Sequence, residues 1–502
     1  MTCFSININI KAVPPLDPGF APLSLFCNEF LKLAKKPLSI AIERNNGLIS
    51  VYDTFITGEN READRYYIER TVKTLLWIKG GFRVFICGDE EIADYIKKEY
   101  SDGGAREFDK KMMERIYGNE FEVLYLPIEQ KPQEMEQSAP IGGNTGGCRI
   151  GFDAGGSDRK VSAVIDGETV YSEETVWHPK ANPDPEYHYN EIVTALKTAA
   201  AKMPRVDAIG ISSAGVYIEN KTMVASLFIK VPQEQFDAKV KDIYIRAAKE
   251  IGDIPLTVVN DGDVTALAGA MELFSPSAHD TSNHQHSTLR SHPLTLHSPL
   301  STLNSKSPPL TPQLTSLNSP LSTLTPQLPS VLGIAMGTSQ AGGFVDGNGH
   351  ITGWLNELAF APVDANPDAA EDEWSGDIGC GVKYFSQDGV IKLAAAAGIK
   401  LPEEMTPGEK LKAIQETDDP RADDIFRSIG CYLGHTLPYY HEFYRFTHVL
   451  LLGRVMSGSG GDIIARIADS VISSEYPQCG IKIHVPDESS RRIGQSVAAA
   501  FL

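Results

Sequence analysis

Hydrophobic positions recur along the first quarter of the chain with two different periods. Alternating apolar runs flank Asn46-Gly47, a dipeptide typical of the tight turn between two antiparallel strands. Apolar residues at helical spacing follow and stop at Gly80-Gly81. We expect a small α/β domain at 37–127, preceded by a poorly patterned and partly disordered segment at 1–36. The pattern predicts strands at 38–42, 48–52, 83–87 and 121–126, and helices at 61–78 and 90–100.

Two further α/β patterns follow, one on each side of a segment of unusual composition. Residues 128–147 are rich in Pro, Gln, Glu and Gly and are expected to form a linker. The first pattern, 148–274, begins with three successive strands and continues with alternating helices and strands. The second pattern, 331–502, has strands near its start and at 449–452. We predict strands at 149–153, 161–165, 169–176, 206–212, 256–259 and 331–336, and helices at 190–202, 234–251 and 463–472.

Residues 275–330 differ sharply from both neighbouring patterns, because Ser, Thr, Pro, Leu and His dominate them. The sequence Ser-Pro-Leu-Ser-Thr-Leu occurs at 298–303 and again at 319–324. Proline recurs too often for a helix or a strand, so we predict a disordered insertion. The alternative is a docking tract, or a metal site formed by His284, His286 and His292. Polar tracts of this kind usually need no ligand.

The composition is that of a soluble globular protein and narrows the choice of partners. The chain has 502 residues, of which 42% are hydrophobic and 22% charged, enough for roughly three domains. The net charge of −19, without a basic stripe, argues against nucleic acid as a partner. We find no apolar run of membrane-spanning length and no signal-peptide pattern. The seven scattered cysteines fit reduced thiols, so we expect a cytoplasmic protein.

Three clusters rich in Gly and Asp carry the candidate chemistry, and each adjoins an apolar run that is predicted to be a strand. They lie at 151–160, 260–263 and 337–343. Glycine turns let backbone N–H groups approach phosphate oxygens without a Cβ in the way. A carboxylate beside a phosphate can accept the proton of an attacking hydroxyl. Together the clusters predict ATP-dependent phosphoryl transfer.

The side chains of these clusters suit separate tasks. Asp153, at the end of its strand, is the candidate Mg²⁺ ligand through water, and Asp261 is the candidate general base. Taken singly, each cluster is an ordinary turn sequence. No P-loop sequence occurs, and 151–156 does not match the dinucleotide-binding sequence, so neither of those folds is expected. The other candidate nucleotide-binding residues are Gly155, Gly156, Ser157, Lys160, Gly337, Thr338, Gly342, Gly343, Gly453 and Ser457.

With these motifs in this order, residues 149–502 without the insertion resemble the ROK family (repressors, open reading frames and sugar kinases) of the actin-like and sugar-kinase ATPase superfamily. Residues 151–157 and 337–343 resemble its two phosphate motifs, and 260–267 the segment of its catalytic Asp. Residues 452–457 resemble its adenosine motif, with Arg454 where a glycine is usual. The resemblance implies two ribonuclease-H-like α/β lobes, Mg-ATP bound between them, a sugar-like small-molecule substrate and often a homodimer.

The chain departs from the family pattern at the positions that concern the acceptor. At 356–360 the family's glutamate is kept as Glu357, but Phe360 stands where a histidine is usual. In the segment 373–382, which resembles the zinc-binding run, only Cys380 remains of the thiols and Val382 replaces a glutamate. Zinc needs about four N or S ligands, so we expect no zinc site here. Because Phe360 and Val382 replace residues that usually contact the sugar, we do not expect the standard recognition of a hexose. The candidate substrate ligands are Asn260, Asn356 and Glu357, and Asn356, Glu357, Glu373 and Asp377 form either a different acceptor pocket or a surface loop.

The leading hypothesis is an ATP-dependent kinase that phosphorylates a hydroxyl of a sugar or similar polyol, with Asp261 as the base. The lost histidine and glutamate motivate a second hypothesis, a non-catalytic sensor of sugar or nucleotide that signals through 37–127. A third is an ATPase that activates a partner protein, although Cys148 is poorly placed to bridge a metal cluster. The segment 37–127 lacks the basic helix-turn-helix of the repressor members, so groove reading is not expected.

Overall fold

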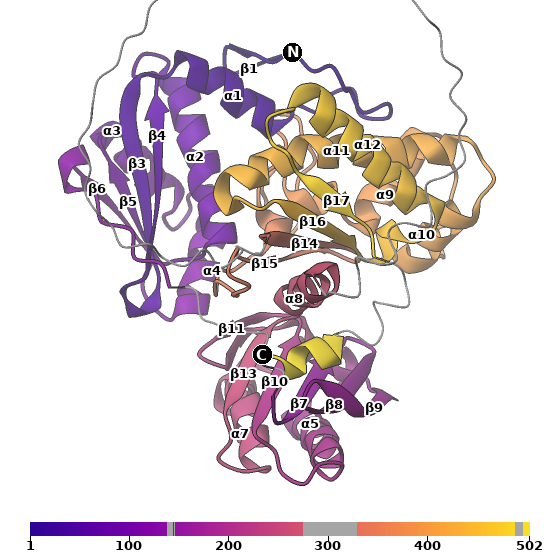
Figure 1. The fold of residues 1–502 in the computed structure, drawn as a ribbon. Helices are drawn as coiled ribbons and strands as arrows, with labels where there is room; N and C mark the ends of the chain where they lie inside the picture. The colour runs from indigo at the N-terminus through magenta and orange to yellow at the C-terminus, as the bar shows by residue number, and fades with distance from the viewer. Residues whose placement is uncertain (138–143, 145, 275–328, 487–494) are drawn as a thin grey trace, which may run out of the picture.

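The computed structural model describes residues 1–137, 144, 146–274, 329–486 and 495–502. Three β-sheets of four or five strands, with helices packed on them, form two lobes and an N-terminal region (Figure 1). This arrangement confirms the expected mixed α/β class. Within the described ranges, no helix has the length and apolar character needed to cross a membrane.

The first lobe is built on a five-stranded sheet in the order β13-β10-β7-β8-β9. Strand β8 is antiparallel to both of its neighbours, while β10 and β13 are parallel to β7. This is the order of a ribonuclease-H-like sheet, and the successive strands β7, β8 and β9 form the predicted meander. The strands are β7 (Cys148–Ala154), β8 (Asp158–Ile165), β9 (Glu168–Val176), β10 (Ala208–Ser213) and β13 (Leu256–Asn260), and the main helices are α5 (Pro185–Ala200) and α7 (Ile243–Lys249).

The second lobe repeats this strand order without its third strand, as β15-β14-β16-β17. Strand β15 is antiparallel to β14, whereas β16 and β17 follow in parallel. Both halves thus have the topology expected of two related lobes. The strands are β14 (Val331–Met336), β15 (Gln340–Val345), β16 (His448–Leu452) and β17 (Lys482–His484), and the helices are α9 (Gln387–Ala396), α10 (Pro407–Glu416), α11 (Arg421–Tyr444) and α12 (Ser459–Glu475).

Two segments connect the lobes. Helix α8 (Asp261–Phe274) starts directly at the end of β13 and packs along β14 and β15 of the second lobe. Residues 495–502 return to the first lobe and pack on glycines of β7 and β10, which leave room for their backbone. A Cβ on Gly151 would lie 1.7 Å from Ser496 O, and a Cβ on Gly210 would lie 1.7 Å from Ala499 O. The second lobe therefore ends before 495, whereas we expected it to reach 502.

The N-terminal region has its own sheet, in the order β4-β3-β5-β6. Strands β3 and β4 form the predicted hairpin, and Asn46 and Gly47 in its turn have φ of 63° and 70°, which these two residue types tolerate. The elements are β3 (Lys36–Glu43), β4 (Ile49–Ile56), β5 (Arg83–Cys87), β6 (Glu122–Leu126), α2 (Arg61–Ile78), α3 (Glu90–Glu99) and α4 (Glu107–Tyr117).

Residues 1–36, which we expected to be poorly patterned and partly disordered, form β1 (Thr2–Cys3), β2 (Ile6–Asn7) and α1 (Leu23–Leu33). Phe26 and Phe30 of α1 are fully buried. Their rings lie 5.1 Å from Tyr66 and 4.5 Å from Tyr67 of α2. The buried apolar residues Leu23, Phe26, Cys27 and Phe30 have the i, i+3, i+4, i+7 spacing of a helix, a signal that sequence reasoning missed.

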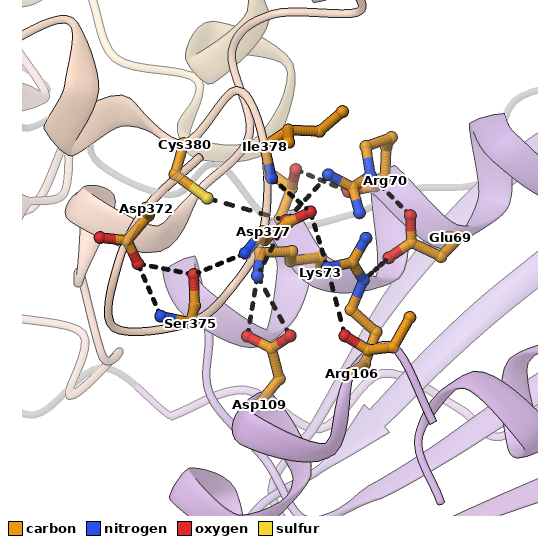
Figure 2. A network of polar contacts seen from close by, with 12 residues as sticks. Glu69, Arg70, Lys73, Arg106, Asp109, Asp372, Ser375, Asp377, Ile378 and Cys380 are labelled. Carbon is orange, nitrogen blue, oxygen red and sulfur yellow. Dashed lines mark hydrogen bonds and ion pairs between the residues drawn. The ribbon is translucent and has the colours of Figure 1, made fainter. Parts of the chain in front are cut away.

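The N-terminal region shares one hydrophobic core with the second lobe and is not a separate domain, in contrast to the expected accessory domain at 37–127. The ring of Trp77 in α2 lies 4.4 Å from that of Phe360, and the ring of Phe20 lies 4.7 Å from that of Tyr432. Figure 2 shows a group of charged side chains that joins the same two parts of the molecule. This charged joint consists of Glu69, Arg70, Lys73, Arg106, Asp109 and Asp377.

The two segments of unusual composition are only partly described. In the expected linker at 128–147, Met135 exchanges two backbone hydrogen bonds with Ile49 of β4, at 2.8 and 2.9 Å. Of the predicted insertion at 275–330, only 329 and 330 lie within the described residues, so the candidate histidine site falls outside them. Ser330 O accepts hydrogen bonds from the backbone N–H groups of Thr447 and His448, at 3.0 and 3.1 Å.

The substitution Gly210→Ala tests the packing of residues 495–502 on the first lobe. The new Cβ would collide with Ala499 O, so the backbone has to move, and we expect a loss of about 1–3 kcal/mol in the free energy of unfolding. Urea unfolding measures this loss. The control Val170→Ala, at an exposed position of β9, should change stability by less than about 0.5 kcal/mol. Equal stability of both variants would contradict this packing.

Candidate functional site

The first glycine turn joins β7 to β8 and is fixed by two hydrogen bonds from a buried tryptophan. The indole Nε1 of Trp177 donates to Gly155 O at 2.7 Å, and its backbone N–H donates to Ser157 O at 3.2 Å. Gly156 and Ser157 are exposed at the tip. The turn is therefore fixed in position while its tip stays open to a ligand.

Asp153 is the penultimate residue of β7 and faces Lys160, its direct partner on β8. Ser212 Oγ donates to its carboxylate at 2.9 Å. Burial raises the pKa of Asp153 to about 6, and the nearby charge of Asp261 adds to the shift, while Ser212 and Lys160 oppose it. The structure thus brings Asp153 and Lys160 of one hairpin together with Asp261, which comes from a distant segment of the chain.

Asn260 and Asp261 mark the passage from β13 to α8. The amide of Asn260 is used by the fold, because its Oδ1 accepts from Gly262 N–H and its Nδ2 donates to Gly215 O, both at 2.7 Å. Burial raises the pKa of Asp261, and a hydrogen bond from Gly262 N–H and the charge of Lys180 oppose this shift. The carboxylate of Asp261 accepts only backbone N–H groups here and forms no side-chain hydrogen bond within the described residues.

Lys180 is a cation of the site that sequence reasoning missed. It lies in the short helical turn Pro179–Ala181, and its Nζ is 3.3 Å from where a Cβ on Gly156 would be. His188 Nε2 lies 3.0 Å from Pro179 O and secures this turn. Within the described residues no carboxylate forms an ion pair with Lys180, whereas Lys160 lies 3.6 Å from Asp158. Its side chain reaches the first glycine turn from an unpatterned loop, so no sequence signal marks it.

The second glycine turn is shorter than expected. It consists of Gly337, Thr338 and Ser339 between β14 and β15, and Thr338 and Ser339 are exposed. Gly342 and Gly343 lie inside β15 rather than in the turn. A Cβ on Gly343 would lie 2.0 Å from Gly262 O, and one on Gly342 would lie 2.7 Å from Asn356 O. The structure thus gives these two glycines a packing role, since they let β15 approach α8 and the loop at 356.

The predicted adenosine segment begins beside the second glycine turn. Gly453 follows β16 with a φ of 92°, and a Cβ there would lie 2.3 Å from Met336 O at the end of β14. Ser457 O accepts a hydrogen bond from Gln415 Nε2 at 3.2 Å, which holds the segment against α10. The segment and the turn therefore share one edge of the sheet, at the ends of two adjacent parallel strands.

The acceptor loop, Asn356 and Glu357, is suspended from the end of α2. Asn356 N–H donates to Ile78 O at 3.0 Å, and Glu357 N–H donates to Trp77 O at 2.9 Å. The side chain of Asn356 is occupied, because Nδ2 donates to Asp263 Oδ1 at 2.9 Å and Oδ1 accepts from Tyr444 Oη at 3.0 Å. Asn356 thus links α8 and α11 within the site, and its side chain has little hydrogen-bonding capacity left for a substrate.

Glu357 remains free to meet a ligand. Within the described residues its carboxyl group has no hydrogen-bond partner and no ion pair. Burial raises the pKa of Glu357 to about 7, and the charges of Asp261 and Asp263 contribute. Burial also raises the pKa of Asp263 to about 7, although Phe344 N–H and Asn356 oppose it. Asp153, Asp261, Asp263 and Glu357 together form an acidic cluster where the lobes meet.

A cavity of about 230 Å³ opens beside the acidic cluster. Its wall includes Asn260 and Asp263 and the aromatic side chains of Tyr117, Tyr217 and Trp354. Tyr117 belongs to α4, so the N-terminal region contributes to this wall together with both lobes. Sequence reasoning missed all three aromatic residues, because they come from three distant segments.

The alternative acceptor pocket containing Glu373 and Asp377 is wrong for these two residues. Asp377 is buried within the charged joint, and Glu373 forms a surface ion pair with Lys383 at 2.7 Å. Phe360, at the position of the usual histidine, packs between Trp77 and Phe108 with ring distances of 4.4 and 5.4 Å. Among the described residues, no group of three or more His, Cys, Asp or Glu is arranged to hold a metal ion.

Comparison with known proteins gives matches among solved structures. No family model matches the sequence, and no curated protein matches it. A ROK hexokinase from Thermus thermophilus is similar at 15% identity and a TM-score of 0.47, over 70% of this chain and 97% of that one. A ROK family glucokinase from Streptomyces griseus, in complex with glucose and AMPPNP, is similar at 17% and 0.45, over 70% and 98%. A ROK family transcriptional regulator, a homolog of the E. coli MLC protein, is similar at 16% and 0.48, over 71% and 78%.

The raised pKa of Asp263 predicts a pH-dependent effect of Asp263→Asn. In the folded state this carboxyl holds its proton up to about pH 7, so its contribution to stability is complete below about pH 4 and is lost as the pH rises through 7. Asparagine keeps the oxygen that accepts from Phe344 N–H and carries no charge. Relative to the wild type, the variant should gain about 1–3 kcal/mol in urea unfolding between pH 5 and pH 8. The same difference at both pH values would argue against a buried, protonated Asp263.

Proposed function

We propose that this chain is a divergent ROK-type, ATP-dependent phosphotransferase that phosphorylates a hydroxyl of a sugar or related small molecule. The observation that carries the proposal is the position of Asp261. Its carboxylate stands at the N-terminus of α8, where the lobes meet, and interacts electrostatically with Asp153 and Lys180 beneath the first glycine turn. Phosphoryl transfer needs this combination of an anion-binding turn, cations and a base.

Asp261 is the candidate general base. Burial raises its pKa toward the working pH, which suits a group that takes a proton from the acceptor hydroxyl and later releases it. Lys180 and the N–H group of Gly262 at the N-terminus of α8 oppose this shift. These positive groups favour the charged form of the carboxylate, which is the form that accepts a proton.

The phosphates of the donor would lie between the two glycine turns. Ser157, Lys160 and Lys180 approach from the first lobe, and Thr338 approaches from the second. The carboxylate of Asp153 would hold, through water, a magnesium ion carried by a nucleotide, because such an ion takes one or two protein carboxylates and keeps several waters. Bound magnesium would neutralise charge on the transferred phosphoryl group. Gly453 and Ser457 would border the nucleoside.

The acceptor would lie near Glu357, which interacts electrostatically with Asp261 and Asp263, and would extend toward the 230 Å³ cavity whose wall includes Asp263. Glu357 is the carboxylate left free to hold acceptor hydroxyls. The aromatic side chains of Tyr117 and Tyr217 would offer apolar surface to the carbon side of a sugar ring, whereas the ring of Trp354 is already covered by Phe344 and Lys79. We infer that the acceptor is recognised by this wall in place of the missing histidine and glutamate.

Replacement of Asp261 by Asn tests the proposal directly. The variant keeps the shape of the side chain and loses the base, so turnover should fall by a factor of about 10²–10⁴ while the KM for ATP changes little. ADP release over a panel of sugars measures both constants. The control Asp253→Asn, in the exposed loop before the same strand, should behave like the wild type. Undiminished turnover in the Asp261 variant would refute its assigned role, and binding of ligands without turnover by the wild type would favour a sensor.

Lys180 supplies a separate test of the donor site. Lys180→Met removes a cation beside Gly156 without touching the acceptor wall, so the KM for ATP should rise by about tenfold or more and the KM for the sugar should stay the same. Lys180→Arg keeps the charge and should recover most of the affinity. A loss of sugar affinity alone in Lys180→Met would place this side chain on the wrong side of the site.

A further inference from the structure

The loop that carries Glu357 is attached to α2 at two separate places. The first is the end of the helix, where the carbonyl groups of Trp77 and Ile78 accept the N–H groups of Glu357 and Asn356. Carbonyl groups in the last turn of a helix have no partner within the helix, so they are available to hold another segment. This attachment sets the backbone that carries the Glu357 carboxyl.

The second attachment is Asp377, which lies in the same loop and enters the charged joint (Figure 2). Three cations surround its carboxylate, which lies 2.9 Å from Arg70 Nη1, 3.1 Å from Lys73 Nζ and 2.6 Å from Arg106 Nη1. Although burial opposes it, these cations lower the pKa of Asp377 below its ordinary value. Its side chain is only 2% exposed, so this carboxylate anchors the loop and is not available to a substrate.

The charged joint is closed and balanced. Glu69 pairs with Arg70 at 2.5 Å and with Arg106 at 2.6 Å. Asp109 pairs with Lys73 at 3.0 Å. Three cations and three carboxylates thus neutralise one another away from water, with no side chain more than 12% exposed. A buried group of this kind tolerates one arrangement of its members, because any displaced charge would be left unpaired.

Trp77 links the two attachments. Its indole Nε1 donates to Asp109 at 2.6 Å, and Asp109 is tied through Lys73 to Asp377. The carbonyl group of the same residue holds Glu357 N–H, and its ring packs on Phe360. A continuous series of direct contacts therefore runs from Asp377 to the backbone of Glu357.

We propose that Asp377 is a positioning residue for the acceptor: through Lys73, Asp109 and Trp77 it fixes the place of Glu357, so that the N-terminal region is an integral part of the acceptor site. The expected effect on the KM of the acceptor rests on the proposed function. The expected effect on the position of Glu357 rests on geometry alone. The proposal assigns to α2 and Asp377 the task of holding a loop that keeps only one thiol, Cys380, of the expected zinc-binding run.

The test compares Asp377→Asn with Glu373→Gln, which removes a carboxylate from the same loop at an exposed ion pair. Hydrogen–deuterium exchange measures how firmly the N–H groups of this loop are held, and it needs no substrate. In Asp377→Asn the N–H groups of 356 and 357 should exchange at least about tenfold faster than in the wild type, with the first lobe unchanged. Glu373→Gln should match the wild type throughout. Unchanged exchange at 356 and 357 in folded Asp377→Asn would overturn the proposal.

Kinetics supply the functional arm of the same test. Asp377→Asn should raise the KM for the acceptor by about tenfold or more and leave the KM for ATP within about twofold, and Asp377→Glu should recover part of the loss. Equal changes in both constants would indicate a merely structural role and overturn the proposal.

If Asp377→Asn does not fold, the double variant Asp377→Asn/Lys73→Met, which removes one charge of each sign, takes its place in both arms. If the wild type phosphorylates no acceptor, the proposed function fails while hydrogen exchange still decides the positioning role.

Discussion

The lobes meet through their backbones, where Gly262 of α8 lies against Gly342 and Gly343 of β15. A Cβ on Gly262 would lie 2.1 Å from Gly342 O, and one on Gly343 would lie 2.0 Å from Gly262 O. With no side chain between them, the first turn of α8 has one position relative to both sheets. Asp261 and Asp263 are part of that turn, so the same contact places one carboxylate toward the first lobe and the other toward the acceptor loop. Burial at this contact is the main cause of the raised pKa values in the acidic cluster, and neighbouring carboxylates add to the shifts of Asp153, Asp263 and Glu357.

The charged joint shows how a buried ionic group can serve a fold without adding much stability. Ion pairs taken out of water gain little over apolar packing, yet removal of one partner typically costs about 3–5 kcal/mol. Such a group therefore selects one arrangement more than it strengthens the fold. Together with the packing of Phe360 against Trp77 and Phe108, it fixes a loop that retains only one of its expected thiols. The N-terminal region provides this fixation from a distant part of the chain.

Much of the fold was predictable because its elements follow local periods: the Asn46-Gly47 hairpin, the meander from β7 to β9 and the strand that ends at Asn260 all have clear patterns. Asp153 and Asp261 lie near each other where two predicted strands end, and their roles in binding and catalysis stay predictions. The sequence could not show that Gly342 and Gly343 serve packing, because close approach depends on a distant helix. Nor could it reveal Lys180, Tyr117 or the burial of Asp377, which come from loops or elements brought together by tertiary contacts.

The two ends of the unusual segment after α8 are both anchored on the second lobe. Helix α8 packs along β14 and β15, and Ser330 is bound at the start of β16. Between such fixed ends, each doubling of loop length adds only about 0.6 kcal/mol to the free energy of loop closure. Repeats could therefore accumulate or disappear here over evolutionary time without disturbing the geometry of the cleft. The same reasoning makes this connection a permissive point for splitting the chain or grafting a reporter protein.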